Sequence, residues 1–447
     1  MHGKLTRSGF LTQRTRDVEE KYTLKPVGSP NFPAPPPLRC YKRVGAGQLL
    51  LPRHATEAAA EGVEDVRPEP EAAEGLSFRG ALRAGFQEEA VAKTLQSLRG
   101  VGGAVLSLAP GQGKTACAFY CIAALRKKTL VLVHKNVLAD QWEERARQFL
   151  GLETLGRIQG DRWDVEGRPV VVAMIQTLCA KEWDPVAFDA FGMVVVDEAH
   201  HVPAQVFSRA MFLMSPQYTL GLTATPDRAD KCEQALYWFL GPQSYLLRRE
   251  CEAGSAAYAV LRWEAGDALG APPTRWDGTL SQAEWVTALA ECEERTDVIV
   301  RAVDAILRAE PGRRVIVLTD RREHVANLVD AWGAHRAGAY VGGMKRDALE
   351  ASSVKDIIVA TYGLASEGLD IPELDTVVLA TPRSDVRQAI GRAMRDGGAR
   401  RYSTLIVDVL DAWGGSVGHA MHNKRRRIYS AQHIDAVPDF FSTYSLV

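Results

Sequence analysis

The sequence predicts an α/β protein with two successive domains, each a parallel β-sheet covered by helices. From Leu76 onward, short β-branched runs alternate with longer segments in which apolar residues recur at helical spacing, a pattern typical of such sheets. The series occurs twice along the chain. The length of 447 residues also exceeds the size at which a single hydrophobic core keeps growing, which favours more than one domain.

Each series supplies its own set of predicted strands and helices. The strands of the first series are predicted at residues 103–108, 129–134, 169–175, 193–197 and 218–223, with helices at 113–128 and 136–150. Those of the second are predicted at residues 314–320, 337–343, 356–362, 376–382 and 403–411, with helices at 322–333 and 384–395. We therefore expect α/β domains at residues 76–248 and 249–432, followed by a tail at 433–447.

The first 75 residues form an N-terminal extension of different composition. Residues 26–37 are dense in proline, and the segment "CYKRVGAGQLLLPRH" at residues 40–54 contains a short apolar run that predicts one or two strands. Residues 55–75 are rich in Ala, Glu and Pro and contain no aromatic residue. Because such a tract buries little apolar surface, we expect it to be a disordered acidic linker.

The composition argues against several classes of protein. The 54 Lys and Arg residues nearly balance 55 Asp and Glu residues, so net charge neither requires nor excludes a polyanionic partner. Seven scattered cysteines without a CxxC pair argue for a reducing compartment and against a zinc ribbon or a disulfide scaffold. No apolar run approaches the roughly 20 residues that span a bilayer, and no secretory signal is visible. We expect a soluble, intracellular protein without a membrane partner.

The segment "APGQGKT", residues 109–115, connects a predicted strand to a predicted helix. In that context Gly111 and Gly113 let backbone N–H groups close on phosphate oxygens, and Lys114 reaches the outer phosphates. The Thr115 hydroxyl can ligate Mg²⁺. Taken alone, the segment could also be a glycine-rich turn with an exposed lysine.

The segment "MVVVDEAHH" is a predicted buried strand that ends in two carboxylates, Asp197 and Glu198. In phosphate-loop ATPases the metal is held by the loop hydroxyl and by an acidic residue at the end of another strand, and Asp197 fits that role. Glu198 lies at the same carboxyl edge, where it could orient or deprotonate an attacking water. The alternative is a strand end with ordinary surface acids.

In the second series, "QAIGRAMR" carries Arg392 and Arg395 three residues apart within a predicted helix. Residues at this spacing share a helix face, so both guanidinium groups could reach one phosphate group. Arginines that act on the transferred phosphate accelerate phosphoryl transfer by about 10³- to 10⁵-fold. Two arginines on a helix are otherwise usually a solvated face.

Taken in order, the motifs resemble the full series of superfamily 2 helicases and translocases. The series is "FQEEA", "APGQGKT", "VLVHKNVLADQW", "MIQT", "VVVDEAHH", "GLTATP", "VIVLTDR", "ATYGLASEGLDIP" and "QAIGRAMR", and it covers roughly Leu76 to Asp408. The resemblance implies two tandem RecA-like domains, ATP and Mg²⁺ as substrate and cofactor, and a nucleic-acid strand as partner.

The resemblance also implies a role for each motif residue. The residues expected to bind the nucleotide are Gln87, Gly111, Gln112, Gly113, Lys114, Thr115, Gly368 and Asp370, and Gln87 is expected to contact the adenine edge. Catalysis falls to Lys114, Asp197, Glu198, Gln388, Arg392 and Arg395, and Mg²⁺ to Thr115 and Asp197. Coupling of the ATP state to the nucleic acid falls to His200, Thr223 and Thr225. Contacts with the strand fall to His134, Lys135, Gln176, Thr177, Asp320, Arg321 and Thr361.

Finer features are similar to the XPB and UvsW branch and to helicases of large DNA viruses related to the poxviral transcript-release helicase. These features are "GLTATPDRADK", "ALYWFLGPQSYLLRRE", "YVGGMKRDAL" and "LLLPRH". This resemblance implies a monomer that acts on DNA rather than RNA, with transcription machinery as a further partner. If the protein is viral, the resemblance implies a place in the virion or the infected cell. An RNA helicase and a non-catalytic, helicase-like interaction factor are the alternatives.

Two remaining groups of residues are interpreted as packing. Cys117 and Cys121 lie one helical turn apart, but the chain contains no second pair that would complete a metal site. Trp142, Trp163 and Trp238 occur in helical or apolar contexts, so we expect them in the core rather than as platforms for nucleobases.

Overall fold

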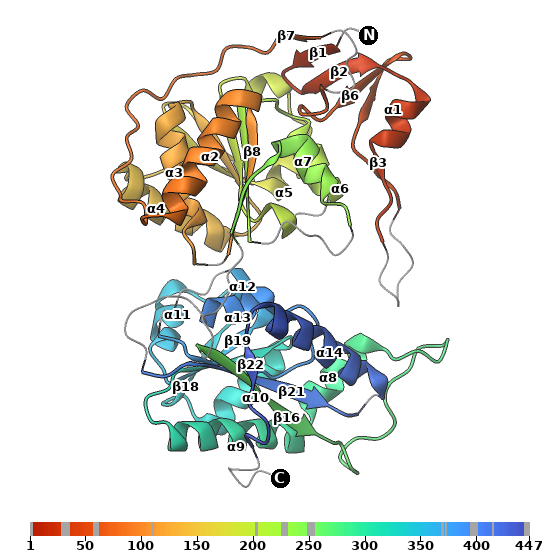
Figure 1. Cartoon of the computed structure of the whole chain (residues 1–447), viewed down its shortest axis with the longest axis vertical. Coiled ribbons are helices and arrows are strands. Elements are labelled where there is room, and N and C mark those ends of the chain that lie inside the picture. The colour runs from red at the N-terminus through yellow and green to blue at the C-terminus, as the bar shows by residue number, and fades with distance from the viewer. Residues whose placement is uncertain are drawn as a thin grey trace. The chain divides into compact units, whose positions relative to one another are not determined.

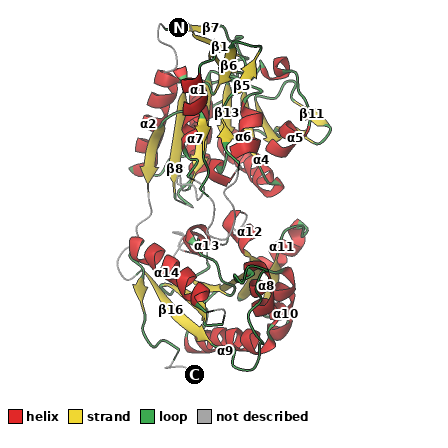
Figure 2. Cartoon of the chain, turned by 90° about the vertical axis from the view of Figure 1, so that its right-hand side faces the viewer, coloured by secondary structure: helices red, strands yellow, loops and turns green. Residues whose placement is uncertain are grey.

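The computed structural model describes residues 3–27, 36–56, 62–109, 111–201, 204–224, 231–247, 255–367, 371, 373–393, 401–413 and 415–441. The chain divides into two compact units, residues 1–248 and 249–447 (Figure 1). We call them unit 1 and unit 2. Each contains a mostly parallel sheet with helices on both faces (Figure 2). The predicted α/β fold class is therefore confirmed.

Unit 1 is built on an eight-stranded sheet with the order β11-β10-β12-β9-β13-β14-β8-β15. All neighbouring strands are parallel except β11, which runs antiparallel to β10 at one edge. The strands are β8 (Gly103–Leu108), β9 (Thr129–Val133), β10 (Gly156–Gln159), β11 (Arg162–Asp164), β12 (Val170–Met174), β13 (Met193–Val196), β14 (Tyr218–Thr223) and β15 (Gln243–Leu247).

Helices bury both faces of this sheet, which is why its central strands are continuous apolar runs. In β13, Met193 and Val195 face one hydrophobic cluster, and Val194 and Val196 face the other. The first cluster is shared with α2 (Phe86–Val101), α3 (Lys114–Leu125) and α4 (Asn136–Leu150). The second is shared with α5 (Ile175–Ala180), α6 (Ala204–Met211), α7 (Gln234–Leu240) and the 3₁₀ helix η2 (Pro185–Phe188).

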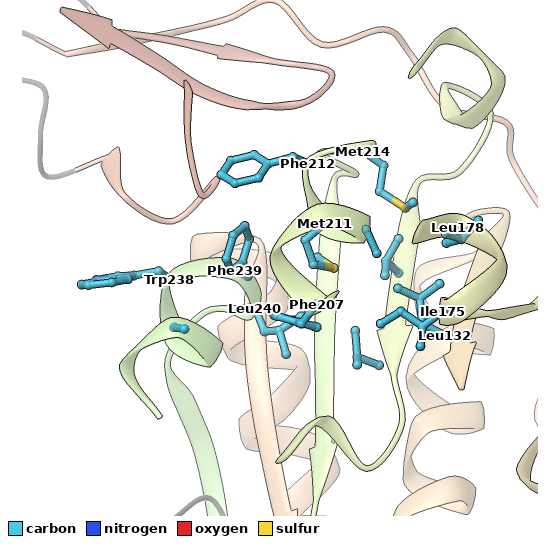
Figure 3. Packing of buried hydrophobic residues seen from close by; sticks show 14 of the residues in the cluster. Leu132, Ile175, Leu178, Phe207, Met211, Phe212, Met214, Trp238, Phe239 and Leu240 are labelled. Carbon is cyan, nitrogen blue, oxygen red and sulfur yellow. The ribbon is translucent and has the colours of Figure 1, made fainter. Parts of the chain in front are cut away.

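A five-stranded N-terminal sheet packs on the second of these faces. Its order is β5-β6-β2-β1-β7, formed by β1 (Gly3–Thr6), β2 (Gly9–Gln13), β5 (Lys42–Val44), β6 (Gln48–Leu51) and β7 (Val63–Asp65). The short helix α1 (Arg16–Lys21) and the pair β3 (Thr23–Leu24) and β4 (Leu38–Arg39) complete it. Phe207 and Met211 of α6 and Trp238 and Phe239 of α7 form the underlying cluster (Figure 3).

The N-terminal extension is more structured than its composition indicates. Strands β5 and β6 agree with the apolar run at residues 40–54, whereas β1 and β2 were not expected. The expectation of a disordered linker is wrong for residues 62–75, because β7 pairs in parallel with β1 and Ala72 forms a bridge with Lys127. Acidic side chains of this tract form ion pairs with lysines of the main sheet domain, and Glu71 lies 2.7 Å from the ammonium group of Lys128. Backbone pairing and charge thus replace the apolar burial that the tract lacks.

Arg53 and His54 fix the N-terminal sheet to the main sheet of unit 1. The Arg53 guanidinium donates to the carbonyl oxygens of Gly102 and Gln217 at 2.9 and 3.1 Å. His54 Nε2 lies 2.9 Å from the Thr219 hydroxyl. A side chain at Gly103 would meet the His54 ring at 2.3 Å, so only glycine permits this approach. Burial lowers the pKa of Arg53 to about 9 and, aided by the charges of Arg53 and Arg67, the pKa of His54 to about 2.

The neutrality of buried His54 predicts acid sensitivity. An unfolded histidine takes up a proton near pH 6.5, whereas folded His54 does not until about pH 2. The stability that this site contributes is thus present above pH 6.5 and lost as pH falls below it. Lowering pH from 7.5 to 5.5 should cost about 1.4 kcal/mol at this residue. In urea unfolding of a His54→Asn variant, this part of the pH dependence should be absent.

Exposed His419 supplies the control, since His419→Asn should keep the pH dependence of the wild type. Equal pH dependence of the wild type and the His54→Asn variant would contradict a neutral, buried His54.

Unit 2 contains a seven-stranded sheet with the order β18-β19-β17-β20-β21-β16-β22, parallel throughout. The strands are β16 (Ala256–Trp263), β17 (Val315–Thr319), β18 (Ala337–Tyr340), β19 (Ile357–Thr361), β20 (Thr376–Leu379), β21 (Thr404–Asp411) and β22 (Asp435–Ala436). The helices are α8 (Gln282–Glu291), α9 (Glu293–Ala309), α10 (Arg322–Trp332), α11 (Arg346–Ser353), α12 (Tyr362–Glu367), α13 (Arg387–Ala393) and α14 (Ser416–Ala431).

Unit 2 also differs in detail from the sequence prediction. Strand β16 was not predicted, although it pairs with β21 over its whole length. Beyond residue 432, where a tail was expected, β22 pairs with β16, and Phe441 is buried among α9, α10 and the sheet. Among the described residues of both units, no helix has the length and apolar content needed to cross a membrane.

Candidate nucleotide and nucleic-acid sites

The predicted phosphate loop runs from the end of β8 into the first turn of α3. Gly111 and Gly113 have φ angles of 80° and 81°, in the left-handed region that glycine adopts without strain. A side chain at Gly113 would meet Gln87 Nε2 at 2.4 Å. That nitrogen donates to the Gln112 carbonyl at 2.8 Å, and Gln87 Oε1 accepts from the Arg83 N–H at 2.7 Å. The amide of Gln87 is therefore held against the loop in one orientation.

Lys114 lies beside the carboxylates at the end of β13. Its ammonium group donates to the Leu108 carbonyl at 3.2 Å and lies 3.7 Å from Glu198 Oε1. Glu198 has a φ angle of 46°, which is uncommon for a residue with a side chain and is typical of functional sites. The structure thus brings together the lysine of the loop and Glu198, which the sequence placed in separate motifs.

Asp197 is buried and held by two donors. Trp142 Nε1 donates to Oδ2 at 2.8 Å, and the Glu198 N–H donates to Oδ1 at 2.9 Å. Burial and the neighbouring charge of Glu198 raise the pKa of Asp197 to about 6, against the opposing effects of Trp142 and Lys114. A cation beside Asp197 would therefore be favourable. The Thr115 hydroxyl and the Asp197 carboxylate are oxygen donors of the kind that Mg²⁺ accepts together with phosphate oxygens.

A chain of polar contacts leads away from Glu198 along the edge of the sheet. His200, in the 3₁₀ helix η3 (Ala199–His201), has its Nδ1 3.6 Å from Glu198 Oε2 and 2.8 Å from the hydroxyl of Thr223. Thr223 is the last residue of β14, the neighbour of β13 in the sheet. Two of the three predicted coupling residues are therefore connected to Glu198.

The strand contacts predicted for unit 1 lie at the same edge of its sheet. His134 and Lys135 follow β9, and Gln176 and Thr177 follow β12, which pairs with β9 in parallel. Gln176 Nε2 donates to the His134 carbonyl at 2.9 Å, so the structure brings the two pairs together. The Thr177 hydroxyl accepts from the Gly160 N–H at 3.0 Å, which fixes the turn between β10 and β11.

In unit 2, Asp320 and Arg321 follow β17, and Thr361 ends β19 beside it. Arg383 donates to Asp320 Oδ1 at 3.1 Å. The Arg321 guanidinium donates to the Thr287 hydroxyl at 2.9 Å and to the Ala283 carbonyl at 2.8 Å, both in α8. Arg321 is thus tied to the helix next to it.

The remaining predicted residues cannot be placed against these contacts. Thr225, Gly368, Asp370 and Arg395 lie outside the described residues. Gln388 and Arg392 lie on α13, where the structure describes the backbone but not these two side chains. Their roles stay predictions.

The three tryptophans predicted to lie in the core differ in their surroundings. Trp142 and Trp238 are buried as expected, but Trp142 also holds Asp197, 55 residues further along the chain, and no local signal reveals that contact. The prediction for Trp163 is wrong, because it is 40% exposed on edge strand β11, where it stacks on Trp183. An edge strand has no neighbour to cover it. Cys117 and Cys121 are buried in the core, as expected.

Comparisons with known proteins agree with this arrangement. The family model described as "Type III restriction enzyme, res subunit" matches residues 83–228, and "Helicase conserved C-terminal domain" matches residues 294–397. The chain is 28% identical over 352 residues to "Putative ATP-dependent RNA helicase L396" of Acanthamoeba polyphaga mimivirus, covering 75% of this chain and 65% of that protein. It is also 28% identical over 355 residues to "DNA 3'-5' helicase XPB" of Mycobacterium tuberculosis, covering 72% and 60%.

The chain therefore spans less than two thirds of the length of both relatives. Among solved structures, S. cerevisiae Dbp5 bound to RNA and ADP BeF3 superimposes with a TM-score of 0.53 at 15% identity, over 80% of this chain and 91% of that one, and indicates the same fold. Together the motifs, the two matched domains and these relatives confirm the resemblance. The chain belongs to the superfamily 2 helicases, and its relatives include XPB-like DNA helicases and helicases of large DNA viruses.

Proposed function

We propose that this protein is a nucleic-acid-dependent ATPase that uses ATP hydrolysis to unwind or translocate along a strand. The observation that carries the proposal is the cluster at the carboxyl edge of the sheet in unit 1. Lys114, Asp197 and Glu198 converge there behind a loop shaped by two left-handed glycines. Such a cluster is suited to phosphoryl transfer from a nucleoside triphosphate to water.

Each residue has a separate part in this proposal. Lys114 leaves its contact with Glu198 to neutralise the outer phosphates, and the N–H groups at the start of α3 bind the phosphate oxygens. Thr115 and Asp197 would hold Mg²⁺, which supplies charge neutralisation of the phosphates. Glu198 orients the attacking water and accepts its proton. Gln87, fixed against the loop, presents its amide to the adenine edge.

The contact chain from Glu198 to Thr223 supports coupling between hydrolysis and the nucleic acid. His200 touches both residues, so a change in the position of Glu198 on loss of the γ-phosphate would alter the hydrogen bond at the end of β14. His134 and Gln176, the predicted strand contacts, lie at the same edge and support this coupling. We propose that this edge holds the sugar-phosphate backbone, which provides binding without sequence selection.

We further propose DNA as the strand on which the protein acts. The similarity to the relative described as "DNA 3'-5' helicase XPB" supports this choice, and the relative described as an RNA helicase gives the alternative. Strand displacement on DNA, RNA and hybrid duplexes with either overhang tests this choice. Phosphate release that rises with added nucleic acid tests the function itself. A purified protein that releases no phosphate would instead support a non-catalytic interaction factor.

Trp142 provides a test of the proposed metal site. In a Trp142→Phe variant the ring stays apolar, but Asp197 loses a donor that fixes its carboxylate. Loss of a residue that orients a metal ligand typically weakens metal binding about tenfold or more. The Mg²⁺ concentration for half-maximal ATPase activity should therefore rise about tenfold.

A Trp332→Phe variant is the matched control. Trp332 is also buried, and its Nε1 has no hydrogen-bond partner among the described residues. An equal Mg²⁺ requirement in the wild type and in the Trp142→Phe variant would show that Trp142 does not position a metal ligand.

A further inference from the structure

The segment between β16 and α8, residues 264–281, presents a tryptophan to solvent. Trp276 is 98% exposed, the highest value among the large hydrophobic side chains that the structure describes. The next highest is Val354 at 74%. In Figure 1 the green segment that joins β16 to α8 projects to the side of its sheet. Neither the helicase motifs nor the proposed ATP site uses this segment.

The tip of this segment is a closed hairpin. Thr274 and Leu280 form an antiparallel bridge, and the Arg275 N–H donates to the Thr279 carbonyl at 2.7 Å. Inside the turn, Asp277 Oδ1 accepts from the N–H and the hydroxyl of Thr279 at 2.9 and 2.6 Å. These bonds define the backbone on both sides of Trp276. The hairpin therefore places Trp276 on an ordered turn outside the core.

The base of the hairpin is anchored to unit 2. Trp285, in α8, is fully buried with Trp263 and Leu289, and Leu269 and Leu280 from the segment pack against this cluster. Trp413 Nε1 donates to the Gly270 carbonyl at 2.9 Å, and the Trp285 indole donates to the Trp413 carbonyl at 3.0 Å. The hairpin is thus supported by a small hydrophobic core at its base.

The same base adjoins the predicted strand contact Arg321. A cavity of about 600 Å³ lies there, and its lining includes Leu269, Ala271, Pro273, Thr287, Arg321 and Trp413. The hairpin segment follows the carboxyl end of β16, and Arg321 follows the carboxyl end of β17. Because the sheet is parallel throughout, both lie at the same edge of it. Trp276 is seven residues from Ala283, to which Arg321 donates. An extended chain of that length spans at most about 25 Å, or roughly seven base-pair steps.

We propose that Trp276 is a nucleic-acid contact that stacks on an unpaired base beside the strand held at Arg321. An indole offers a large, flat face on which any nucleobase stacks, and such stacking does not depend on sequence. A hairpin with a rigid base and an aromatic tip can keep an opened base from pairing again. The proposal rests on the proposed function, because it requires a nucleic-acid strand at this edge.

The test uses the full chain with Trp276→Ala and Trp276→Phe, and Val354→Ala as a control at another highly exposed apolar side chain. The ligand is forked DNA that carries 2-aminopurine at successive positions from the junction. Loss of one stacked base should weaken binding of the fork about five- to 150-fold in Trp276→Ala. The Phe variant should keep most of the affinity, because phenylalanine still stacks.

Two further readouts separate stacking from a structural role. Because Trp276 is almost wholly exposed, its replacement should not change the thermal unfolding midpoint. The number of base pairs opened per ATP hydrolysed should fall in Trp276→Ala, and the wild-type 2-aminopurine change near the junction should disappear. Fork affinity and fluorescence equal to those of the wild type would overturn the proposal for Trp276. A wild-type protein that binds neither DNA nor RNA, and whose ATPase activity is not stimulated by either, would instead overturn the proposed function.

Discussion

A Glu198→Gln variant is expected to bind ATP with nearly wild-type affinity and to hydrolyse it about 10²- to 10⁴-fold more slowly, the range for loss of a general base. Glutamine keeps the shape of the side chain but cannot accept the proton of the attacking water. It also removes the negative charge 3.7 Å from Lys114, which leaves that lysine free to bind phosphate. Single-turnover hydrolysis and binding of a fluorescent ATP analogue would measure the two effects separately.

Unlike Glu198→Gln, Lys114→Ala should weaken ATP binding as well as slow hydrolysis. Removal of the ammonium group leaves the outer phosphates without their cation, so ATP affinity should fall together with the rate. Exposed Glu166 in the same unit supplies a control, and Glu166→Gln should leave both quantities unchanged. A Glu198→Gln protein that hydrolyses ATP within about threefold of the wild type would contradict the role of Glu198, which rests on a predicted loss of 10²-fold or more.

The sequence predicts this site well because its main parts are contiguous motifs. Gly113 and Lys114 are neighbours, as are Asp197 and Glu198, and each pair lies shortly after an apolar run that predicts a buried strand. Parallel strands place their carboxyl ends at one edge, so the two motifs were expected to meet. The contact of Lys114 with Glu198 is a consequence of that rule.

Other contacts could not be predicted, because they join residues that are far apart and have no motif of their own. The bond from Trp142 to Asp197 depends on how α4 packs against the sheet, and its sequence reads only as an amphipathic helix. Arg53 donates to the carbonyl of Gly102, which is 49 residues further along the chain. In the sequence, Gly102 and Gly103 indicate only the end of a helix. Composition failed at β7 because backbone pairing with β1 does not require apolar side chains.

In unit 2 the sequence did not reveal β16 or the hairpin within residues 264–281, for a related reason. The segment "AAYAVLRW" contains three alanines and a single β-branched residue, Val260, so it lacks the β-branched run that marks a central strand. Its position in the sheet is set by its pairing with β21, which is more than 140 residues away in the sequence. The hairpin that follows has turn residues but no helicase motif, and only its exposed tryptophan distinguishes it.

Asp408 connects the core of unit 2 to the edge of its sheet where Asp320, a predicted strand contact, lies. Its carboxylate accepts from Arg425 Nε and Nη2 at 3.0 and 2.6 Å, from the Tyr429 hydroxyl at 2.9 Å, and lies 3.1 Å from His422 Nδ1. Arg425 also donates to the carbonyl of Arg383, the residue that pairs with Asp320. Burial alone would raise the pKa of Asp408, but the hydrogen bond from His422 and the charge of Arg425 outweigh it and hold this pKa below its usual value.

Asp408→Ala should lower the free energy of unfolding of unit 2 by about 3–5 kcal/mol, because Arg425 would remain buried and charged without its partner. The carboxylate is fully buried, so solvent does not screen this loss. Hydrogen exchange of residues 404–411, followed by mass spectrometry at increasing urea, would localise the effect to β21. Asp297→Ala, which breaks the exposed pair of Asp297 with Arg301 on α9, should cost no more than about 0.5 kcal/mol. Similar losses in the two variants would show that the Asp408 cluster does not stabilise unit 2.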